Sequence, residues 1–326
     1  MQRRKRGLAQ MPDTRLDSFL DEPRIAAGER RAELGSIRSG RYGNRRVAVD
    51  VNCDDKDSGA AVVERECKTA LSKSELRGIE YALNPYRGCP HRCAYCYAPA
   101  ILHYPRGGWG KVVEAKTNLP AVLARELRAK KPGLIAIGSI SDPYQPAEER
   151  LRITRHCLEQ LLAKQWKVLV LTKSDLVLRD IGLLKRFSDC EVEISIGTLD
   201  DEIRALLEPG ALPMERRLAA VRKLADEGIR TCIFMGPFYP TNKLEELPEI
   251  VEALVESGAG HVVMDKLNLR EGVADSVRVA LAAKPDMLQV WEKALNPGPA
   301  REEYYRNAAS RLRELCKGRI GFDTAF

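Results

Sequence analysis

Short apolar runs alternate with longer amphipathic stretches from about residue 80 onward. Most of these runs are too short for helices, rich in β-branched residues and bounded by Gly, Pro or Asp, as buried parallel strands are. A repeated β–α alternation of this kind implies a parallel sheet with right-handed crossovers. The runs cover residues 134–137, 168–171, 192–196, 232–235 and 261–264, with a weaker one at residues 80–84.

The stretches between the runs have the periodicity of amphipathic helices. In residues 213–227, Leu218, Val221 and Leu224 form one apolar stripe, and Gly228 follows as a helix stop. Six β–α units are too few for a complete eight-stranded barrel, so the sequence predicts an α/β fold with a partial (βα)6 TIM-type barrel. The other predicted helices cover residues 121–130, 150–164, 244–257 and, near the end of the sequence, 301–317.

Composition divides the 326 residues into three parts. Residues 1–70 are rich in Arg, Gly, Asp and Ser and show little apolar periodicity beyond residues 46–51, which predicts a basic, partly disordered extension with at most a short strand. Residues 71–280 hold the alternating pattern and predict the barrel core. Residues 281–326 predict a helical C-terminal extension.

The net charge of +7 is concentrated near the start of the sequence, because residues 1–48 hold twelve Lys or Arg and six Asp or Glu. A basic arm can neutralise phosphates, which makes nucleic acid a candidate partner, and a solvated tail is the alternative. We expect no membrane span, because no apolar run reaches about 18 residues. We expect no secretory signal, since no apolar segment follows the basic N-terminus.

Three of the nine cysteines lie within eight residues, in the spacing C-x3-C-x2-C formed by Cys89, Cys93 and Cys96. Thiolates at this spacing can hold one compact metal centre, and the crowding favours metal ligation in a reducing cytoplasm. Three ligands leave one iron of a four-iron cube open to another molecule. The alternatives are unliganded core cysteines, or zinc with His91 as a fourth ligand, although this is not a common zinc-finger spacing.

The same segment resembles the radical S-adenosylmethionine (SAM) superfamily, and within it the branch related to spore photoproduct lyase. The resemblance spans roughly residues 80–270 and includes Tyr95 before the last cysteine. Residues 84–89 (NPYRGC), 141–146 (SDPYQP), 208–210 (EPG) and 215–218 (ERRL) look like that branch. It implies a [4Fe–4S] cluster on the three cysteines, SAM on the open iron, and a reduced flavodoxin- or ferredoxin-type electron donor.

The resemblance also implies residues that bind SAM. Tyr95 matches the aromatic position beside the adenine, and Tyr97 a tyrosine near SAM. Ser141, Lys173 and Ser195 match polar residues that hold SAM, and they lie at or just beyond the ends of predicted strands, where parallel strands deliver ligand-binding groups. The alternatives are structural: Ser141 could cap a helix, Lys173 could be a surface charge, and Ser195 could contact a neighbouring strand.

Candidate catalytic residues are Tyr97, Asp142 and Tyr144, the latter two being expected to face the mouth of the barrel. A turn at Asp142 is the alternative. Ser139 occupies the position at which the lyase has the cysteine that returns a hydrogen atom to thymine. An O–H bond is too strong for that step, so repair of spore photoproduct by the same route is not expected.

Two classes of function follow from these features. The first is an enzyme that cleaves SAM reductively for radical chemistry on an unidentified substrate, with nucleic acid and lyase-like DNA repair as candidates. The second is a zinc-containing protein that binds nucleic acid through the basic arm and the cysteine segment. An electron-transfer protein with a cluster but no SAM turnover is a third reading, against which the predicted SAM-binding residues argue.

Overall fold

The computed structural model describes residues 41–42, 45–46 and 59–326. Strand β1 (Arg41–Tyr42) pairs antiparallel with β2 (Arg45–Arg46) in a unit separate from the rest. Apart from these strands, the predicted basic arm and the apolar run at residues 46–51 lie outside the described residues. The arm's role in nucleic-acid binding therefore stays a prediction.

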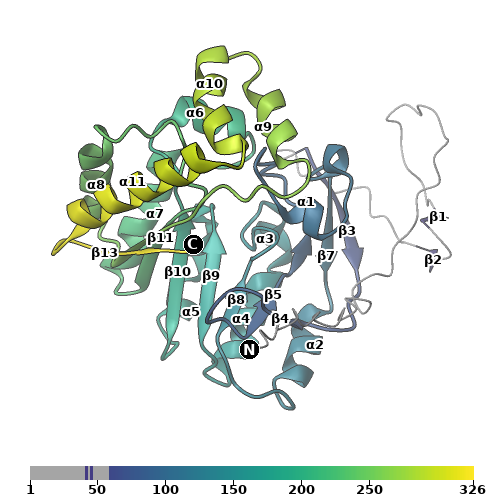
Figure 1. Cartoon of the computed structure of the whole chain (residues 1–326). Coiled ribbons are helices and arrows are strands. Elements are labelled where there is room, and N and C mark those ends of the chain that lie inside the picture. Colours follow the sequence, from purple (N-terminus) through teal and green to yellow (C-terminus); the bar gives the residue numbers. More distant parts are fainter. Residues whose placement is uncertain (1–40, 43–44, 47–58) are drawn as a thin grey trace, which may run out of the picture. The chain divides into compact units, whose positions relative to one another are not determined.

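An open eight-stranded sheet confirms the predicted partial barrel (Figure 1). Its order is β13-β12-β11-β10-β9-β8-β5-β4, and six parallel strands from β5 to β12 coincide with the six predicted runs. Strand β13 extends the sheet in parallel beside β12, and β4 borders β5 antiparallel. The bounds are β4 (Leu71–Lys73), β5 (Tyr81–Leu83), β8 (Ile135–Ile137), β9 (Val168–Thr172), β10 (Cys190–Ser195), β11 (Arg230–Met235), β12 (His261–Met264) and β13 (Gly321–Thr324).

Alternating burial along the strands separates the two faces of this sheet. One set of side chains is fully buried and apolar and belongs to the main core under the helices. The other set is half-buried, includes charged residues and faces the inside of the partial barrel. Examples of the core-facing set are Val168, Val170, Val192 and Ile194, and of the inward set Leu169, Leu171, Glu193 and Ser195.

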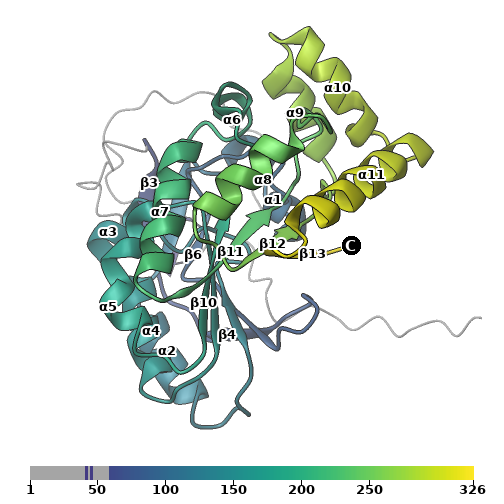
Figure 2. The same ribbon diagram turned by 90° about the vertical axis from the view of Figure 1, so that its left-hand side faces the viewer.

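Helices α2, α4, α5 and α7 lie along one side of the sheet (Figure 2). The predicted helix over residues 150–164 is interrupted, because Arg152 takes a left-handed conformation with φ 52°. The buried Glu148 carboxylate then accepts bonds from the backbone amides of Thr154 at 2.9 Å and Arg155 at 3.2 Å, and so caps the second segment. No helix in the described residues is long and apolar enough to cross a membrane. The bounds are α1 (Ala98–Ile101), α2 (Leu119–Glu126), α3 (Ala147–Leu151), α4 (Ile153–Leu162), α5 (Ile181–Leu184), α6 (Asp201–Leu207), α7 (Met214–Asp226), α8 (Leu247–Glu256), α9 (Val273–Leu281), α10 (Pro285–Leu295) and α11 (Pro299–Cys316), with 3-10 turns η1 (Arg106–Gly108) and η2 (Asp175–Asp180).

A second, three-stranded sheet positions the cysteine segment. Strand β7 (Val112–Lys116) pairs parallel with β3 (Ala61–Arg65) and antiparallel with β6 (Tyr86–Arg87). Gly88 follows β6 with φ +96°, and a Cβ there would lie 2.3 Å from the Val112 carbonyl oxygen. Only glycine therefore lets the chain turn away from β7 at this point, directly before Cys89.

Candidate functional site

The three cysteines lie in one loop between β6 and α1, which we call the cysteine loop (residues 88–97). Cys89 is buried, whereas Cys93 and Cys96 are half-buried. The Arg106 guanidinium donates to the Cys96 carbonyl oxygen at 2.9 Å and to the Ala94 carbonyl oxygen at 3.4 Å. These bonds fix the backbone on which two of the three thiols are carried.

The segment that follows α6 holds the cysteine loop from the other side. The Ala94 amide donates to the Leu207 carbonyl oxygen at 2.8 Å, and the Gly210 amide donates to the His91 carbonyl oxygen at 3.1 Å. A Cβ at Gly210 would lie only 2.1 Å from the Pro90 carbonyl oxygen. The two backbones therefore pack directly on each other, which requires glycine at position 210.

Burial raises the pKa of the Cys89 thiol to about 12 and also raises the pKa values of Cys93 and Cys96. Thiolates at these positions would need bound cations, and metal coordination deprotonates such thiols. Within the described residues, no three Cys, His, Asp or Glu side chains converge as the ligands of a single ion do. The ligands of a four-iron cube need no such convergence, because each binds a different iron.

The carboxyl ends of neighbouring strands bring polar groups to one edge of the sheet. Ser195 ends β10, Lys173 follows β9, and Ser141 lies in the segment after β8. Among the residues that the structure describes, the buried Ser141 hydroxyl oxygen has no hydrogen-bond partner. Within residues 59–326, Nζ of Lys173 has no hydrogen-bond or ion-pair partner, and it lies 5.9 Å from the centre of the Tyr95 ring.

The charge of Lys173 is favoured by its surroundings. Burial alone would lower the pKa of this ammonium, but Cys93 and Glu208 outweigh burial and raise the pKa above its ordinary value. The ammonium therefore stays charged beside the cysteine loop, and no anion of residues 59–326 is bonded to it. Such a group is suited to the carboxylate of a ligand.

Tyr97 and Ser139 lie together where the cysteine loop meets the end of β8. The Tyr97 hydroxyl donates to the Ser139 carbonyl oxygen at 3.0 Å, and Nδ2 of Asn84 donates to the Ser139 hydroxyl at 3.2 Å. Burial raises the pKa of Tyr97 to about 12, so its hydroxyl stays protonated. The structure thus brings a neutral phenol and a hydroxyl, rather than a thiol, to this position.

Asp142 and Tyr144, expected to face the mouth of the barrel, are both buried. Oδ1 of Asp142 accepts from the Thr172 hydroxyl at 2.7 Å and from the Tyr144 amide at 2.9 Å, and Oδ2 accepts from the Lys173 amide at 2.7 Å. Tyr144 is 1% exposed and donates to Asp180 at 3.0 Å. This geometry favours a role in local structure, because Asp142 fixes the backbone that carries Lys173.

Sequence reasoning did not assign a role to a buried pair behind the cysteine loop. Glu208 and Arg217 are 1% and 0% exposed, and their side chains form an ion pair. The Tyr95 hydroxyl donates to the same Glu208 carboxylate. The two residues belong to the two short motifs noted in the sequence, at residues 208–210 and 215–218. The sequence therefore singled out both segments, but it did not show that Glu208 and Arg217 contact each other.

Glu193 is a second group that sequence reasoning missed. It lies on the inward face of β10, two residues before Ser195. Burial, with a smaller contribution from Glu191, raises the pKa of Glu193 to about 8. The alternation of β10 could have placed this carboxyl inside the barrel, but the shift depends on neighbours that the fold supplies.

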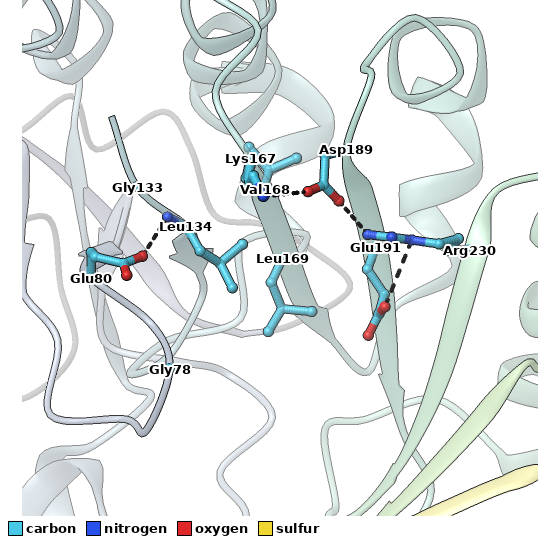
Figure 3. A pocket seen from close by; sticks show the side chains of 10 residues that line it. All are labelled: Gly78, Glu80, Gly133, Leu134, Lys167, Val168, Leu169, Asp189, Glu191 and Arg230. Carbon is cyan, nitrogen blue, oxygen red and sulfur yellow. Dashed lines mark hydrogen bonds and ion pairs between the residues drawn. The ribbon is translucent and has the colours of Figure 1, made fainter. Parts of the chain in front are cut away.

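A pocket of about 440 Å³ lies at the opposite edge of the sheet (Figure 3). Most of its charged residues stand at the amino ends of strands and pair with one another. Asp189 pairs with Lys167 at 3.2 Å and with Arg230 at 2.5 Å, and Arg230 approaches Glu191 at 3.9 Å. Charges at this edge therefore satisfy each other, unlike that of Lys173.

Comparisons with known proteins agree with the geometry. A model of the radical SAM superfamily matches residues 83–254. An uncharacterized protein of Methanocaldococcus jannaschii is 34% identical over 185 residues, which cover 56% of this chain and 70% of that protein. An uncharacterized protein of Mycobacterium tuberculosis is 29% identical over 255 residues, which cover 74% of this chain and 75% of the relative.

Solved structures of spore photoproduct lyase share the fold. One of them, with bound AdoMet and dinucleoside spore photoproduct, has a TM-score of 0.62 at 16% identity and covers 82% of this chain and 83% of the lyase chain. The superfamily uses a [4Fe–4S] cluster and SAM. Its model matches more than half of the present sequence. The chain therefore belongs to the radical SAM superfamily of enzymes.

Proposed function

We propose that this chain binds a [4Fe–4S] cluster through Cys89, Cys93 and Cys96 and cleaves SAM reductively to start radical chemistry. One observation carries the proposal: the cysteine loop lies beside the charged Lys173 ammonium, which has no hydrogen-bond or ion-pair partner in the described part of the chain. The residues fit the cofactors, because three thiols leave one iron open and Lys173 suits a carboxylate. The Ser141 hydroxyl, for which the described residues offer no partner, is a further group that can donate to a bound ligand.

When bound, the cluster supplies the electron that cleaves SAM. The protein's own residues would bind SAM and orient it. Lys173 would hold the SAM carboxylate, Ser141 and Ser195 would hydrogen-bond its polar groups, and Tyr95 would line the adenine side. Tyr97 stays protonated and keeps its bond to the Ser139 carbonyl, so it orients the loop rather than accepting a proton.

The substrate class that we propose to test first is nucleic acid. Support comes from the positive surplus in residues 1–48 and from the fold shared with spore photoproduct lyase. The reaction differs from that of the lyase in its last step, because a Ser139 hydroxyl cannot readily return a hydrogen atom to a carbon radical. A one-electron donor of flavodoxin or ferredoxin type and a reducing, cytoplasmic setting would suit this chemistry.

We also propose that the three parts of the chain divide these tasks. Residues 71–280 would carry the radical chemistry, and residues 1–70 would contact a polyanionic partner. Residues 281–326 would support the core, since α11 and β13 come from this part and β13 pairs with β12.

The test is anaerobic reconstitution with iron, sulfide, reductant and SAM. We expect about four irons per chain, the cubane stoichiometry, and formation of 5′-deoxyadenosine. Cys93→Ala should lose both the iron and SAM cleavage, whereas Cys190→Ala, a buried cysteine of β10, should keep both. Stoichiometric zinc without labile sulfide, or full SAM cleavage by Cys93→Ala, would refute the proposal.

A further inference from the structure

The carboxylate of Glu208 is the centre of a buried network directly behind the cysteine loop. Oε1 accepts from the Tyr95 hydroxyl and, at 3.0 Å, from the Tyr239 hydroxyl, while Oε2 accepts from Nη2 of Arg217. Tyr95 and Tyr239 also pack edge to face, with ring centres 5.9 Å apart. The two tyrosines thus share one acceptor atom but stand on different segments, and only Tyr95 belongs to the cysteine loop.

All three side-chain nitrogens of Arg217 donate hydrogen bonds within the protein. Its Nε donates to the Leu212 carbonyl oxygen at 2.9 Å, and Nη1 donates to the Ser195 carbonyl oxygen at 3.0 Å. With Nη2 on Glu208, each of the three nitrogens has an acceptor, so three of the five N–H donors are used within the protein. The guanidinium thereby joins the end of β10 to the segment that holds the cysteine loop.

Two cations act on the Glu208 carboxylate. Burial raises the pKa of Glu208, but Arg217 and Lys173 outweigh it and lower the pKa to about 2, so the carboxylate is ionised. Of these two cations, Arg217 is bonded to the carboxylate and Lys173 is not, and Asp142 is a second acidic neighbour of Lys173.

We propose that Glu208 and Arg217 are positioning residues that hold Tyr95, and through it the cysteine loop and Lys173, in the arrangement that binds SAM. Neither side chain touches the ligand in this account, because both are buried behind the loop. The Tyr95 ring lies between Glu208 and the Lys173 ammonium: its hydroxyl is bonded to the carboxylate, and its centre is 5.9 Å from Nζ. The inference rests on the proposed binding of the cluster and SAM.

A matched pair of hydroxyl deletions tests the inference in the reconstituted holoenzyme. Tyr95→Phe and Tyr239→Phe each remove one donor from the same Glu208 oxygen, and only the first removes a bond to the cysteine loop. We expect Tyr95→Phe to raise the dissociation constant of SAM at least tenfold and to diminish the SAM-induced change in the EPR spectrum of the reduced cluster. Tyr239→Phe should leave both within about twofold. Equal effects, or none, would overturn the inference.

A second comparison separates positioning from stability. Glu208→Gln alone leaves a buried guanidinium without its counter-charge and can prevent folding, whereas Glu208→Gln with Arg217→Met removes both charges. We expect the double variant to keep its iron and most of its thermal stability but to bind SAM at least tenfold more weakly. If that variant bound SAM with wild-type affinity, the network would have only a structural role. Absence of iron and of SAM cleavage in the wild-type protein would instead refute the proposed function.

Discussion

Replacing Gly210 with alanine tests whether the segment after α6 holds the cysteine loop in place. The new methyl group would lie 2.1 Å from the Pro90 carbonyl oxygen and 3.0 Å from the His91 Cα, whereas ordinary contacts begin at 3.4 Å. One backbone must therefore move by more than about 1 Å, since neither neighbour is the end of a flexible side chain. The Gly210 amide would also be pulled from the His91 carbonyl oxygen, now 3.1 Å away.

The expected cost of Gly210→Ala follows from these two losses. Overpacking of this kind destabilises by about 1–3 kcal/mol, and the weakened hydrogen bond adds about 1 kcal/mol. The displaced residues stand between Cys89 and Cys93, so the ligands themselves would move. We expect a loss of about 2–4 kcal/mol in the free energy of unfolding together with incomplete iron loading.

The matched control is Gly182→Ala. Gly182 lies in helix α5, and a Cβ there would meet nothing within 4 Å. Alanine in a helix is more stable than glycine by up to about 1 kcal/mol, so this variant should be unchanged or slightly stabilised. Anaerobic urea unfolding and iron and sulfide analysis would compare the three proteins. If Gly210→Ala reaches wild-type iron content and stability, the reasoning about the backbone contact is wrong.

Three further predictions concern charge. Lys173→Met should keep the iron yet bind SAM about ten- to a hundredfold more weakly in a titration of the reconstituted protein, because a charge-assisted bond contributes about 1.5–3 kcal/mol; undiminished affinity would contradict this contact. Between pH 4.5 and about 8 the folded protein keeps a proton on Glu193 that the unfolded chain releases, so stability falls as pH rises through this window. Urea unfolding of Glu193→Gln should therefore show a smaller fall than the wild-type protein, and parallel pH profiles would argue against the shifted carboxyl. Deletion of residues 1–48 should flatten the salt dependence of nucleic-acid binding, whereas an unchanged slope would identify a solvated tail.

The central strands could be predicted from sequence because buried parallel strands leave continuous apolar runs whose ends are marked by Gly, Pro or Asp. The edge strands could not. Residues 321–324 form β13 because His261 to Met264 offer a free strand edge, and the residues of β13 alternate only between exposed and half-buried. These residues form a strand because they pair with β12, and their own composition does not predict it. The break at Arg152 was not predicted for a similar reason. The Glu148 carboxylate caps α4 only because the fold buries it next to the first amides of that helix.

The cysteine spacing is local and could be read directly, but the roles of neighbouring polar residues could not. Asp142 follows a strand, as binding residues do, yet its oxygens accept bonds from Thr172 and Lys173, which lie about thirty positions later in the chain. Sequence pattern places a carboxylate at the edge of a sheet but does not say which donors reach it. That information comes only from the register of β8 and β9.

The two edges of the sheet differ in how their charges are satisfied, and this difference supports the proposed site at the carboxyl edge. At the amino edge, Asp189 faces Lys167 and Arg230, so the charges form pairs that need nothing more. At the carboxyl edge, among the described residues, the Lys173 ammonium forms no hydrogen bond or ion pair and the Ser141 hydroxyl is buried without a partner. Unpaired polar groups cost stability, so a folded protein that keeps them beside three clustered thiols is better explained by a ligand that completes them. The amino-edge pocket, although hollow, lacks that energetic reason to bind.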